Sequence, residues 1–512
     1  MRTQRSLKNL IYGGLSQAVY SLLNFVVRFA LIHTLGIEAV SLNGLFTEVI
    51  AVLSLAEMGV GSAIVYHLYA PLKDQDEERL AKLMNLFRSA YRLIALAIFV
   101  IGLVLLPFVH RLVSRMEIDL NYLRLIYFLF LLQTASSYLF SYKTALLNAD
   151  QKVYVISQCT MAVRIVSTGV SIAFLTATKN YIVYLLIQIA AVLSINIAIS
   201  IRADRQYPFL KRKDRLPAAE KKEVLSNVKY LFVVVLSGKI TNSTDNILIS
   251  TMVGTLRVGA YGSYTMIVNA LNSILLQIHH ATTGSIGNLV AEGDHCHTES
   301  VLRRLTFITY CPTVFSAVGI YVVSTPLIRL VFGEEYLLAM PVVFVCTMNF
   351  CIYLIKNPLW AVMSVSGLFA ENKNISVTGD ILNLIVSILL GKWLGIAGIL
   401  LGTSCTLIVQ HVLKTRLLFQ RFLHLPARAY VSLISRELIC CAVCMLTAQG
   451  VCAMLPIANP YWQIVVYGVC AELTAVGINM LFFYRMQEFD YAFKMGRAVL
   501  QMVLRRKKRQ KG

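Results

Sequence analysis

The stretch Lys239–Asn246 reads KITNSTDN and lies inside an otherwise apolar segment that runs from about Val228 to Val253. An apolar segment of this length predicts a helix that crosses the hydrocarbon core of a bilayer. Charged side chains at that depth cost about 2.5–3.5 kcal/mol each, so they face a bundle interior or a water-filled cavity. Two interpretations are open: Lys239 and Asp245 pair and hold neighbouring helices together, or the polar face that includes Asn242 lines a cavity.

The composition of the whole chain is typical of a membrane protein. The chain has 512 residues, of which 57% are hydrophobic and 14% charged, with a mean hydropathy of +0.68. Soluble domains carry about 25% charged residues. Apolar runs of roughly 20 residues recur along nearly the whole length. We therefore predict an all-α polytopic membrane protein with about 14 transmembrane helices, which begin near residues 11, 42, 88, 122, 153, 180, 228, 258, 305, 338, 374, 396, 437 and 461.

The positive charge of the chain fits membrane topology better than nucleic-acid binding. The chain has 47 Lys and Arg against 26 Asp and Glu, a formal net charge of +21. With the N-terminus in the cytoplasm, most of the basic residues fall in cytoplasmic segments, which is the bias that orients membrane proteins. We predict that both termini are cytoplasmic and that no nucleic acid is bound. Neither His295-Cys296-His297 nor the pair Cys441 and Cys444 has the context of a metal or redox site, so no cofactor is predicted.

The first predicted helix carries a narrow polar stripe that ends in an arginine. Four residues fall within about 60° of arc at 100° per residue: Gln17, Ser21, Asn24 and Arg28. Arg28 lies too deep to reach the interface easily. It either pairs with a carboxylate of the second helix, such as Glu48 or Glu57, or offers its guanidinium fork to an anion. We favour the anion.

The two halves of the chain resemble each other at a displacement of 218 residues. Seven identical pairs result: Asn9/Asn227, Tyr12/Tyr230, Asn24/Asn242, Gly36/Gly254, Val40/Val258, Gly44/Gly262 and Thr47/Thr265. The same displacement places Arg28 opposite Asn246, so the two polar stripes occupy equivalent helices. Because each half has six spans, both halves share one topology, which predicts a pseudo-two-fold axis along the membrane normal and a cavity between the halves.

This repeat defines the expected domain organisation. We predict an N-terminal six-helix lobe at 1–201, a basic cytoplasmic linker at 202–227, a C-terminal six-helix lobe at 228–424, two extra helices at 425–484 and a basic cytoplasmic tail at 485–512. The extra helices, with Glu472 as their only charged residue, are expected to face lipid. The eleventh and twelfth helices are glycine-rich and are expected to serve packing.

Further polar residues occur within other predicted spans. Arg164 lies near the middle of the fifth helix, and the eighth helix carries Asn269 and, three residues later, Asn272. The tenth contains Lys356-Asn357-Pro358, where the proline removes a helical hydrogen bond and predicts a kink that could work as a gate.

Several short motifs resemble the polysaccharide flippases of the multidrug/oligosaccharidyl-lipid/polysaccharide exporter superfamily, over essentially the whole length. The motifs are Arg28 through Leu35-Gly36, SLNGLF at Ser41–Phe46, LAEMG at Leu55–Gly59, DNILI at Asp245–Ile249, VGAYGSY at Val258–Tyr264 and SIGNL at Ser285–Leu289. The resemblance implies two six-helix lobes in a V around a central cavity that opens alternately to each side. It also implies a multi-pass protein of the bacterial cytoplasmic membrane.

The resemblance further implies a cargo and the residues that bind it. The cargo would be an undecaprenyl-pyrophosphate-linked oligosaccharide, moved from the inner to the outer leaflet for capsular, exopolysaccharide or O-antigen-type polysaccharide biosynthesis. Basic residues would hold the pyrophosphate and amides the sugar hydroxyls: Arg28, Arg164, Lys239 and Lys356 for the first, Asn24, Asn242, Asn269 and Asn272 for the second. Asn246 is a further predicted substrate-binding residue. Two roles stay open for Asp245, which either holds Lys239 in place or couples transport to a cation. Expected partners are this lipid-linked cargo, membrane lipids, and glycosyltransferases and a polymerase of the same pathway.

Three other functions compete with this one. A multidrug/cation antiporter of the same fold would favour carboxylates in the cavity and usually twelve helices. A peptidoglycan lipid-precursor flippase is poorly separated by sequence. A polysaccharide polymerase, an enzyme, would carry a large external loop, whereas the predicted external segments are short. Because the chain has no phosphate-cradling loop, paired acid/base carboxylates or nucleophile arrangement, we predict a transporter rather than an enzyme.

Overall fold

A computed structural model describes most of the chain. It describes residues 2–53, 67–68, 71–72, 74–114, 116–150, 152–212, 214, 216–217, 220–221, 244–291, 294–366 and 368–494; the side chains of 2–14, 18, 277–291, 364–365 and 369–370 are not described. Of the predicted site residues, Lys239 and Asn242 therefore lie outside the described part of the chain.

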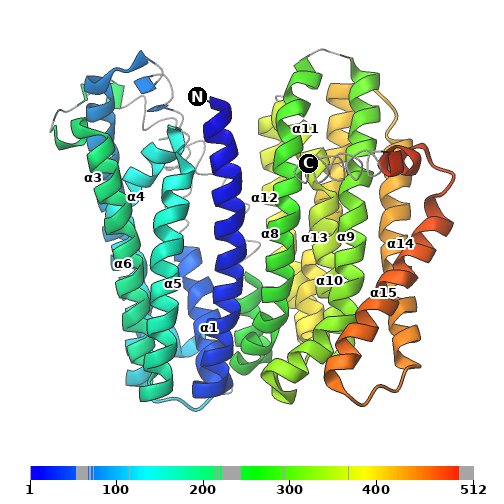
Figure 1. Cartoon of the computed structure of the whole chain (residues 1–512), viewed down its shortest axis with the longest axis horizontal. Coiled ribbons are helices and arrows are strands. Elements are labelled where there is room, and N and C mark those ends of the chain that lie inside the picture. Colours follow the sequence, from blue (N-terminus) through cyan, green and yellow to red (C-terminus); the bar gives the residue numbers. More distant parts are fainter. Residues whose placement is uncertain are drawn as a thin grey trace, which may run out of the picture. The chain divides into compact units, whose positions relative to one another are not determined.

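Helices make up nearly all of the described residues (Figure 1). In chain order they are α1 Arg2–Leu53, α3 Glu77–Leu105, α4 Leu120–Ala149, α5 Val153–Thr178, α6 Tyr181–Gln206, α8 Thr255–Ala291, α9 His295–Phe332, α10 Met340–Ile355, α11 Asn357–Val365, α12 Phe369–Leu394, α13 Ile396–Leu418, α14 Arg428–Ala453 and α15 Pro460–Phe483. Short π-helical turns, Ile249–Val253 and Phe419–Leu423, precede α8 and follow α13.

Eleven described segments are long and apolar enough to cross a membrane. They coincide with the predicted spans that begin near residues 11, 88, 122, 153, 180, 305, 338, 374, 396, 437 and 461. The predicted span near 258 coincides with α8, and the one near 42 begins inside α1. The predicted span near 228 lies mostly outside the described residues. The prediction of an all-α polytopic membrane fold is confirmed.

The helix starts follow from local sequence. An Asp or Asn side chain accepts a hydrogen bond from the first turn at the N-termini of α3, α4, α9 and α15, which leaves fewer backbone N–H groups without a partner. The capping residues are Asp76, Asp119, Asp294 and Asn459.

Two glycines interrupt the helices at equivalent points of the sequence repeat. Gly36 divides α1 with a φ of 77°, and Gly254 ends the π-helical turn before α8 with a φ of 142°. These backbone conformations are open to glycine and strained for residues with a Cβ atom. The 218-residue displacement thus relates two helix breaks as well as seven residue identities.

The chain forms two compact units. The first comprises Met1–Gly262 and Gly391–Ile399, and the second comprises Ser263–Leu390 and Leu400–Gly512. In the first unit α1 packs on α5, and α4 packs on α3 and α6. In the second unit α9 packs on α10, α14 and α15, and α14 also packs on α15.

The helix break in the tenth predicted span is confirmed. The helix α10 ends at Ile355, Lys356 forms a turn, and α11 begins at Asn357 with Pro358 in its first helical turn. A proline there has no N–H to satisfy and its fixed φ suits a helix start, so the chain continues as a second helix.

The close packing predicted for the eleventh and twelfth spans is confirmed at two glycines. A Cβ atom at Gly379 of α12 would overlap the side chain of Gln410 on α13, and one at Gly402 of α13 would overlap Ser387 on α12. At Gly402 the overlap includes the backbone of Ser387, so a residue with a Cβ atom there would push the two helices apart.

The prediction for the two last spans was wrong in one respect. The helix α14 begins at Arg428, and Glu437 therefore lies within the membrane-spanning segment, 0% exposed. Hence Glu472 is not the only charged residue in these two spans. The polar residues before 437 belong to helical turns whose inner face buries Tyr430, Leu433 and Ile434, a pattern that a hydropathy average does not register.

Candidate functional site

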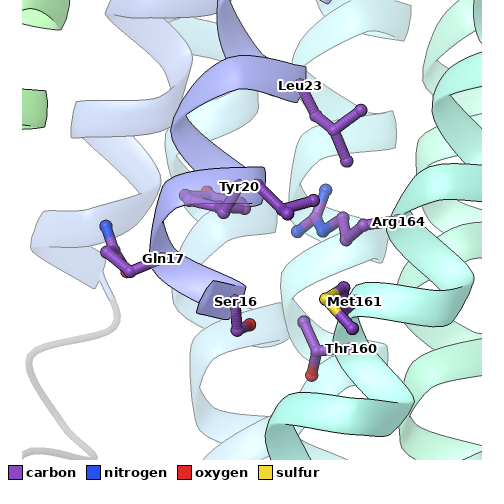
Figure 2. A pocket seen from close by; sticks show the side chains of 8 residues that line it. Ser16, Gln17, Tyr20, Leu23, Thr160, Met161 and Arg164 are labelled. Carbon is purple, nitrogen blue, oxygen red and sulfur yellow. The ribbon is translucent and has the colours of Figure 1, made fainter. Parts of the chain in front are cut away.

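A pocket of about 320 Å³ lies between α1 and α5 in the first unit. Its volume falls within the range of small-molecule sites, about 300–1,000 Å³. The lining residues are Ser16, Gln17, Val19, Tyr20, Leu23, Thr160, Met161 and Arg164. In Figure 2, Tyr20 and Arg164 extend toward each other from the two helices.

Helical periodicity explains why these residues share a pocket. On α1, Ser16, Tyr20 and Leu23 are spaced four and three residues apart, and residues with that spacing lie on one face of a helix. On α5, Thr160 and Arg164 are likewise four residues apart. One face of each helix therefore contributes hydroxyl groups, an aromatic ring and a guanidinium group to the same space.

Among the residues that line this pocket, Arg164 is the one suited to bind an anion. Its guanidinium carbon lies 5.5 Å from the centroid of the Tyr20 ring. The buried Nε has no hydrogen-bond partner among the described residues. No carboxylate among the residues that the structure describes lies within salt-bridge distance of Arg164. An arginine held by a ring rather than by a carboxylate keeps its donors available for an oxyanion.

The predicted site residue Arg28 lies outside this pocket and contacts the start of α8. Its Nη2 donates a 2.6 Å hydrogen bond to the carbonyl of Gly259. A Cβ atom at Gly262 would lie 3.0 Å from the same nitrogen, so the glycine makes room for the guanidinium group. Of the two carboxylates proposed as partners, Glu57 is outside the described residues.

Other contacts join the break in α1 to the start of α8. The Oγ of Ser41 donates hydrogen bonds to the carbonyls of Ile37, at 2.7 Å, and Leu256, at 3.2 Å. A Cβ atom at Gly259 would overlap this Oγ. Because 41 and 259 differ by the repeat displacement of 218, equivalent positions of the two repeats contact each other, as expected near a pseudo-two-fold axis.

A second group of hydrogen bonds joins the connector between α3 and α4 to the same region. The Oγ of Ser250 donates a 2.6 Å hydrogen bond to the carbonyl of Leu112, and the Oγ of Ser114 donates to the carbonyl of Ser250. The backbone N–H of Ser114 donates to Thr255 Oγ1 at 2.9 Å, and the N–H of Thr255 donates to the carbonyl of Ser114 at 3.1 Å. We call all contacts of residues 37–44 and 112–114 with residues 250–262 the α1–α8 clasp.

The remaining predicted site residues are spread over both units. In the first unit Asn24 is exposed, Asp245 is buried, and the Oδ1 of Asn246 has no hydrogen-bond partner among the described residues. In the second unit Asn269 is exposed and Lys356 occupies the turn between α10 and α11. The Oδ1 of Asn272 likewise finds no partner in the described ranges. Among all predicted site residues, Arg164 is the one that lines the pocket.

Sequence reasoning missed several residues of this site. Ser16, Tyr20, Thr160 and Met161 line the pocket but were not predicted. Their helical spacing is visible in the sequence, but which face of α1 meets which face of α5 depends on tertiary packing. A polar residue that is common at helix surfaces, such as Ser16, has no distinctive signal until that pairing is known.

Comparison with known proteins gives one family. The family described as polysaccharide biosynthesis protein matches residues 6–283, more than half of the chain. No curated protein sequence matches the chain significantly.

Several solved structures share the fold. A lipid II flippase, MurJ, in an inward closed conformation has a TM-score of 0.64 and 15% identity, over 93% of this chain and 98% of that chain. An inward-facing multidrug resistance transporter of the MATE family, of the MOP superfamily, has a TM-score of 0.58 and 15% identity, over 77% and 94%. A MATE protein in a bent conformation has a TM-score of 0.52 and 12% identity, over 80% and 92%. These TM-scores indicate a shared fold, and at identities this low the comparison shows the fold alone.

Proposed function

Because the chain belongs to the polysaccharide biosynthesis protein family, we propose that it is a flippase that moves an undecaprenyl-diphosphate-linked oligosaccharide across the bacterial cytoplasmic membrane, from the inner to the outer leaflet. The family match is the observation that carries this proposal. The fold shared with a lipid II flippase and with MATE transporters supports movement of a solute by a membrane protein of this superfamily.

The pocket around Arg164 supplies the chemistry for a diphosphate. A diphosphate that leaves water needs cationic and neutral hydrogen-bond donors in place of its hydration shell. The fork of Arg164 can bind two phosphate oxygens at once, and the hydroxyls of Ser16 and Thr160 add neutral donors from both helices. We assign the diphosphate to this pocket. We assign sugar hydroxyls to the exposed amide of Asn24, which follows the pocket residue Leu23 on α1.

The α1–α8 clasp supports alternating access. With the N-terminus in the cytoplasm, Gly36 and Gly254 lie at the outer end of the first and seventh spans, and the clasp closes that end. Opening it requires the loss of a few hydrogen bonds, among them those of Ser41, Ser114 and Ser250. Each of these hydrogen bonds contributes about 0.5–1.5 kcal/mol to the closed state.

The principal alternative is a multidrug/cation antiporter of the same fold. The pocket favours the flippase, because a cationic drug would be repelled by Arg164, which has no neutralising carboxylate within the described residues. A peptidoglycan precursor also carries a lipid diphosphate, so the pocket chemistry alone does not distinguish it from a polysaccharide repeat unit.

The proposal is tested with the purified full-length chain in liposomes. One set of vesicles contains a fluorescent undecaprenyl-diphosphate trisaccharide in the inner leaflet, and its arrival in the outer leaflet is measured by quenching. A second set measures efflux of ethidium against a proton or sodium gradient. We expect movement of the lipid above the rate in protein-free vesicles and no gradient-driven ethidium efflux. Ethidium efflux without lipid movement would replace the flippase by the antiporter.

A further inference from the structure

Two cysteines from different helices meet in the interior of the second unit. Cys351 lies in the last two turns of α10, and Cys441 lies on α14, 90 residues further along the chain. Their Sγ atoms are 3.2 Å apart, and both residues are free thiols. Both side chains are 0% exposed, and both helices belong to membrane-spanning segments. We call these two residues the cysteine pair.

The partner of Cys441 is not the one that its CxxC spacing suggests. On α15, Asn479 Nδ2 donates to Cys444 Sγ at 3.5 Å, and Cys440 Sγ donates to Asn479 Oδ1 at 3.7 Å. Cys440 and Cys444 therefore belong to the interface between α14 and α15. Cys441 contacts α10 instead, through Cys351. Spacing along one helix could not predict this contact, because the two thiols come from different helices.

The cysteine pair connects two helices that have no covalent link at this point. The helix α9 packs on both α10 and α14, and α10 also packs directly on α14. A single buried cysteine acts as a small apolar residue. Two thiols in contact can in addition form a disulfide, in which the sulfur atoms are about 2.05 Å apart. Such a bond would fix the end of α10, just before the turn at Lys356, against α14.

The surroundings of the cysteine pair select the kind of oxidant that can reach it. Because both thiols are sealed from water, a water-soluble reagent has no direct access to them. The opposite face of α14 is exposed at Ile439, Val443 and Leu446, within the membrane-spanning segment. An oxidant dissolved in the bilayer therefore reaches this helix, and a local separation of α14 from α10 is enough to admit it.

An organic hydroperoxide fits these requirements and balances the reaction. In the first step one sulfur bonds to the terminal peroxide oxygen as the O–O bond breaks, and the thiol proton leaves with the alkoxide as an alcohol. The product is a sulfenic acid. In the second step the other thiol attacks this sulfur, the S–S bond forms, and the hydroxyl group leaves with the thiol proton as water. Two thiols lose two electrons in total, and the peroxide gains them.

We propose that Cys351 and Cys441 are a redox site, at which a membrane-soluble hydroperoxide forms a reversible disulfide that fastens α14 to α10 and arrests transport. The arrest rests on the proposed function, whereas the formation of the disulfide does not. Once the bond has formed, the second unit can no longer move these two helices apart. A thiol reductant that enters the bilayer reverses the bond by thiol–disulfide exchange.

Formation of the disulfide is tested with the purified full-length chain in vesicles of saturated lipid. The vesicles are treated with cumene hydroperoxide, free thiols are blocked with N-ethylmaleimide before denaturation, and peptides are mapped by mass spectrometry without reduction. We expect a peptide that links Cys351 to Cys441 and disappears after treatment with dithiothreitol. Oxidised glutathione, a mild water-soluble oxidant, should leave the pair unlinked. A peptide that links Cys441 to Cys444, or no linked peptide with the hydroperoxide, would overturn the proposal.

Arrest is tested by the flipping rate of the fluorescent undecaprenyl-diphosphate lipid in the same vesicles. We expect the wild-type rate to fall in proportion to the fraction of cross-linked protein and to return with dithiothreitol. Cys351→Ala and Cys441→Ala should keep their rates in the hydroperoxide. The matched control Cys444→Ala, one turn later on α14, should lose its rate as the wild-type chain does. A fully cross-linked wild-type chain that flips as fast as the reduced chain would refute the arrest.

The two readouts separate this inference from the proposed function. If the reduced wild-type chain moves no lipid, the flippase proposal fails, and the linked peptide still decides the redox site. If the lipid moves but no peptide links Cys351 to Cys441, the inference fails alone. Variants are compared only after size-exclusion chromatography shows a folded monodisperse protein. Where an alanine variant does not pass, the serine variant of the same cysteine replaces it.

Discussion

The depth of Arg164 in the membrane was predictable from the sequence, whereas its contacts were not. Its position near the middle of a predicted span was evident from the sequence, and a guanidinium group at that depth indicated a functional or pairing role. The structure adds that its contact is the ring of Tyr20 and that its Nε lacks a described partner. Neither fact follows from the sequence, because hydropathy identifies a helix but not the helix face that meets it.

Removal of the guanidinium group of Arg164 should impair cargo binding without unfolding the protein. We expect Arg164→Ala to reduce flipping of the diphosphate lipid by about tenfold to a hundredfold, the loss of one charge-assisted contact. Arg164→Lys should recover part of the rate, since an ammonium group keeps the charge but not the fork. The exposed Arg205 at the end of α6 gives the control Arg205→Ala. Equal rates for Arg164→Ala and the control would remove Arg164 from the site.

Arg28 lies outside the Arg164 pocket, and its predicted role in cargo binding stays a prediction. Because its Nη2 bonds to the carbonyl of Gly259, we expect Arg28→Ala to abolish polymer export while the protein still inserts in the membrane. Arg28→Lys should restore export in part, since one ammonium donor can still reach a carbonyl. Export is measured as cell-surface polymer and insertion as protein in the membrane fraction. Normal export by Arg28→Ala would exclude Arg28 from cargo binding and show that its hydrogen bond to Gly259 is dispensable.

At the scale of elements, local chemistry made some features predictable. Pro358 predicted the interruption between α10 and α11, and the paired glycines Gly36 and Gly254 marked equivalent helix breaks. The start of α14 was placed too late, because its first turns are polar on one face and a window average underestimates them. Glu437 consequently appeared to precede the span that in fact buries it.

The approach of the two repeat elements depends on Gly259. A side chain there would overlap Ser41 Oγ and press on the carbonyl of Ile37, 3.4 Å from the Cβ position. We expect Gly259→Val to prevent the clasp from closing and to cut the flipping rate at least about tenfold, since overpacking costs about 1–3 kcal/mol. Gly450→Val is the matched control, because nothing lies within 4 Å of its Cβ position. A Gly259→Val protein that transports like this control would show that the close approach is dispensable.

At the scale of the whole molecule, fold class and family were accessible from the sequence. Apolar runs predicted a polytopic helical fold and short motifs a polysaccharide family; the family match confirms the family, and the structural neighbours share the fold. The binding site was less accessible. Arg164 lies in the pocket of the first unit, whereas Asn269, Asn272 and Lys356 belong to the second unit. Helical periodicity identifies the polar face of a single helix. It does not identify which faces of different helices pack together around a pocket.

A disulfide across the clasp should stop the transport cycle. We expect Ser114→Cys/Thr255→Cys to form one on mild oxidation, because the backbone N–H of Thr255 donates to the carbonyl of Ser114 at 3.1 Å and places the two residues side by side. No native cysteine occurs in 112–114 or 250–262. Oxidation should abolish flipping by the double variant and leave the wild-type chain active, and a reductant should restore the rate. A fully cross-linked protein that still flips its cargo would refute the alternating opening of this end.

The central claim is that the chain carries a lipid-linked glycan by its diphosphate. The most direct measurement is the initial flipping rate of the wild-type chain for two lipids with the same glycan, one linked through undecaprenyl diphosphate and one through undecaprenyl monophosphate. We predict that the diphosphate lipid moves at least about tenfold faster, because the fork of Arg164 then binds oxygens of both phosphates. Equal rates for the two lipids, or no movement of either, would contradict the account.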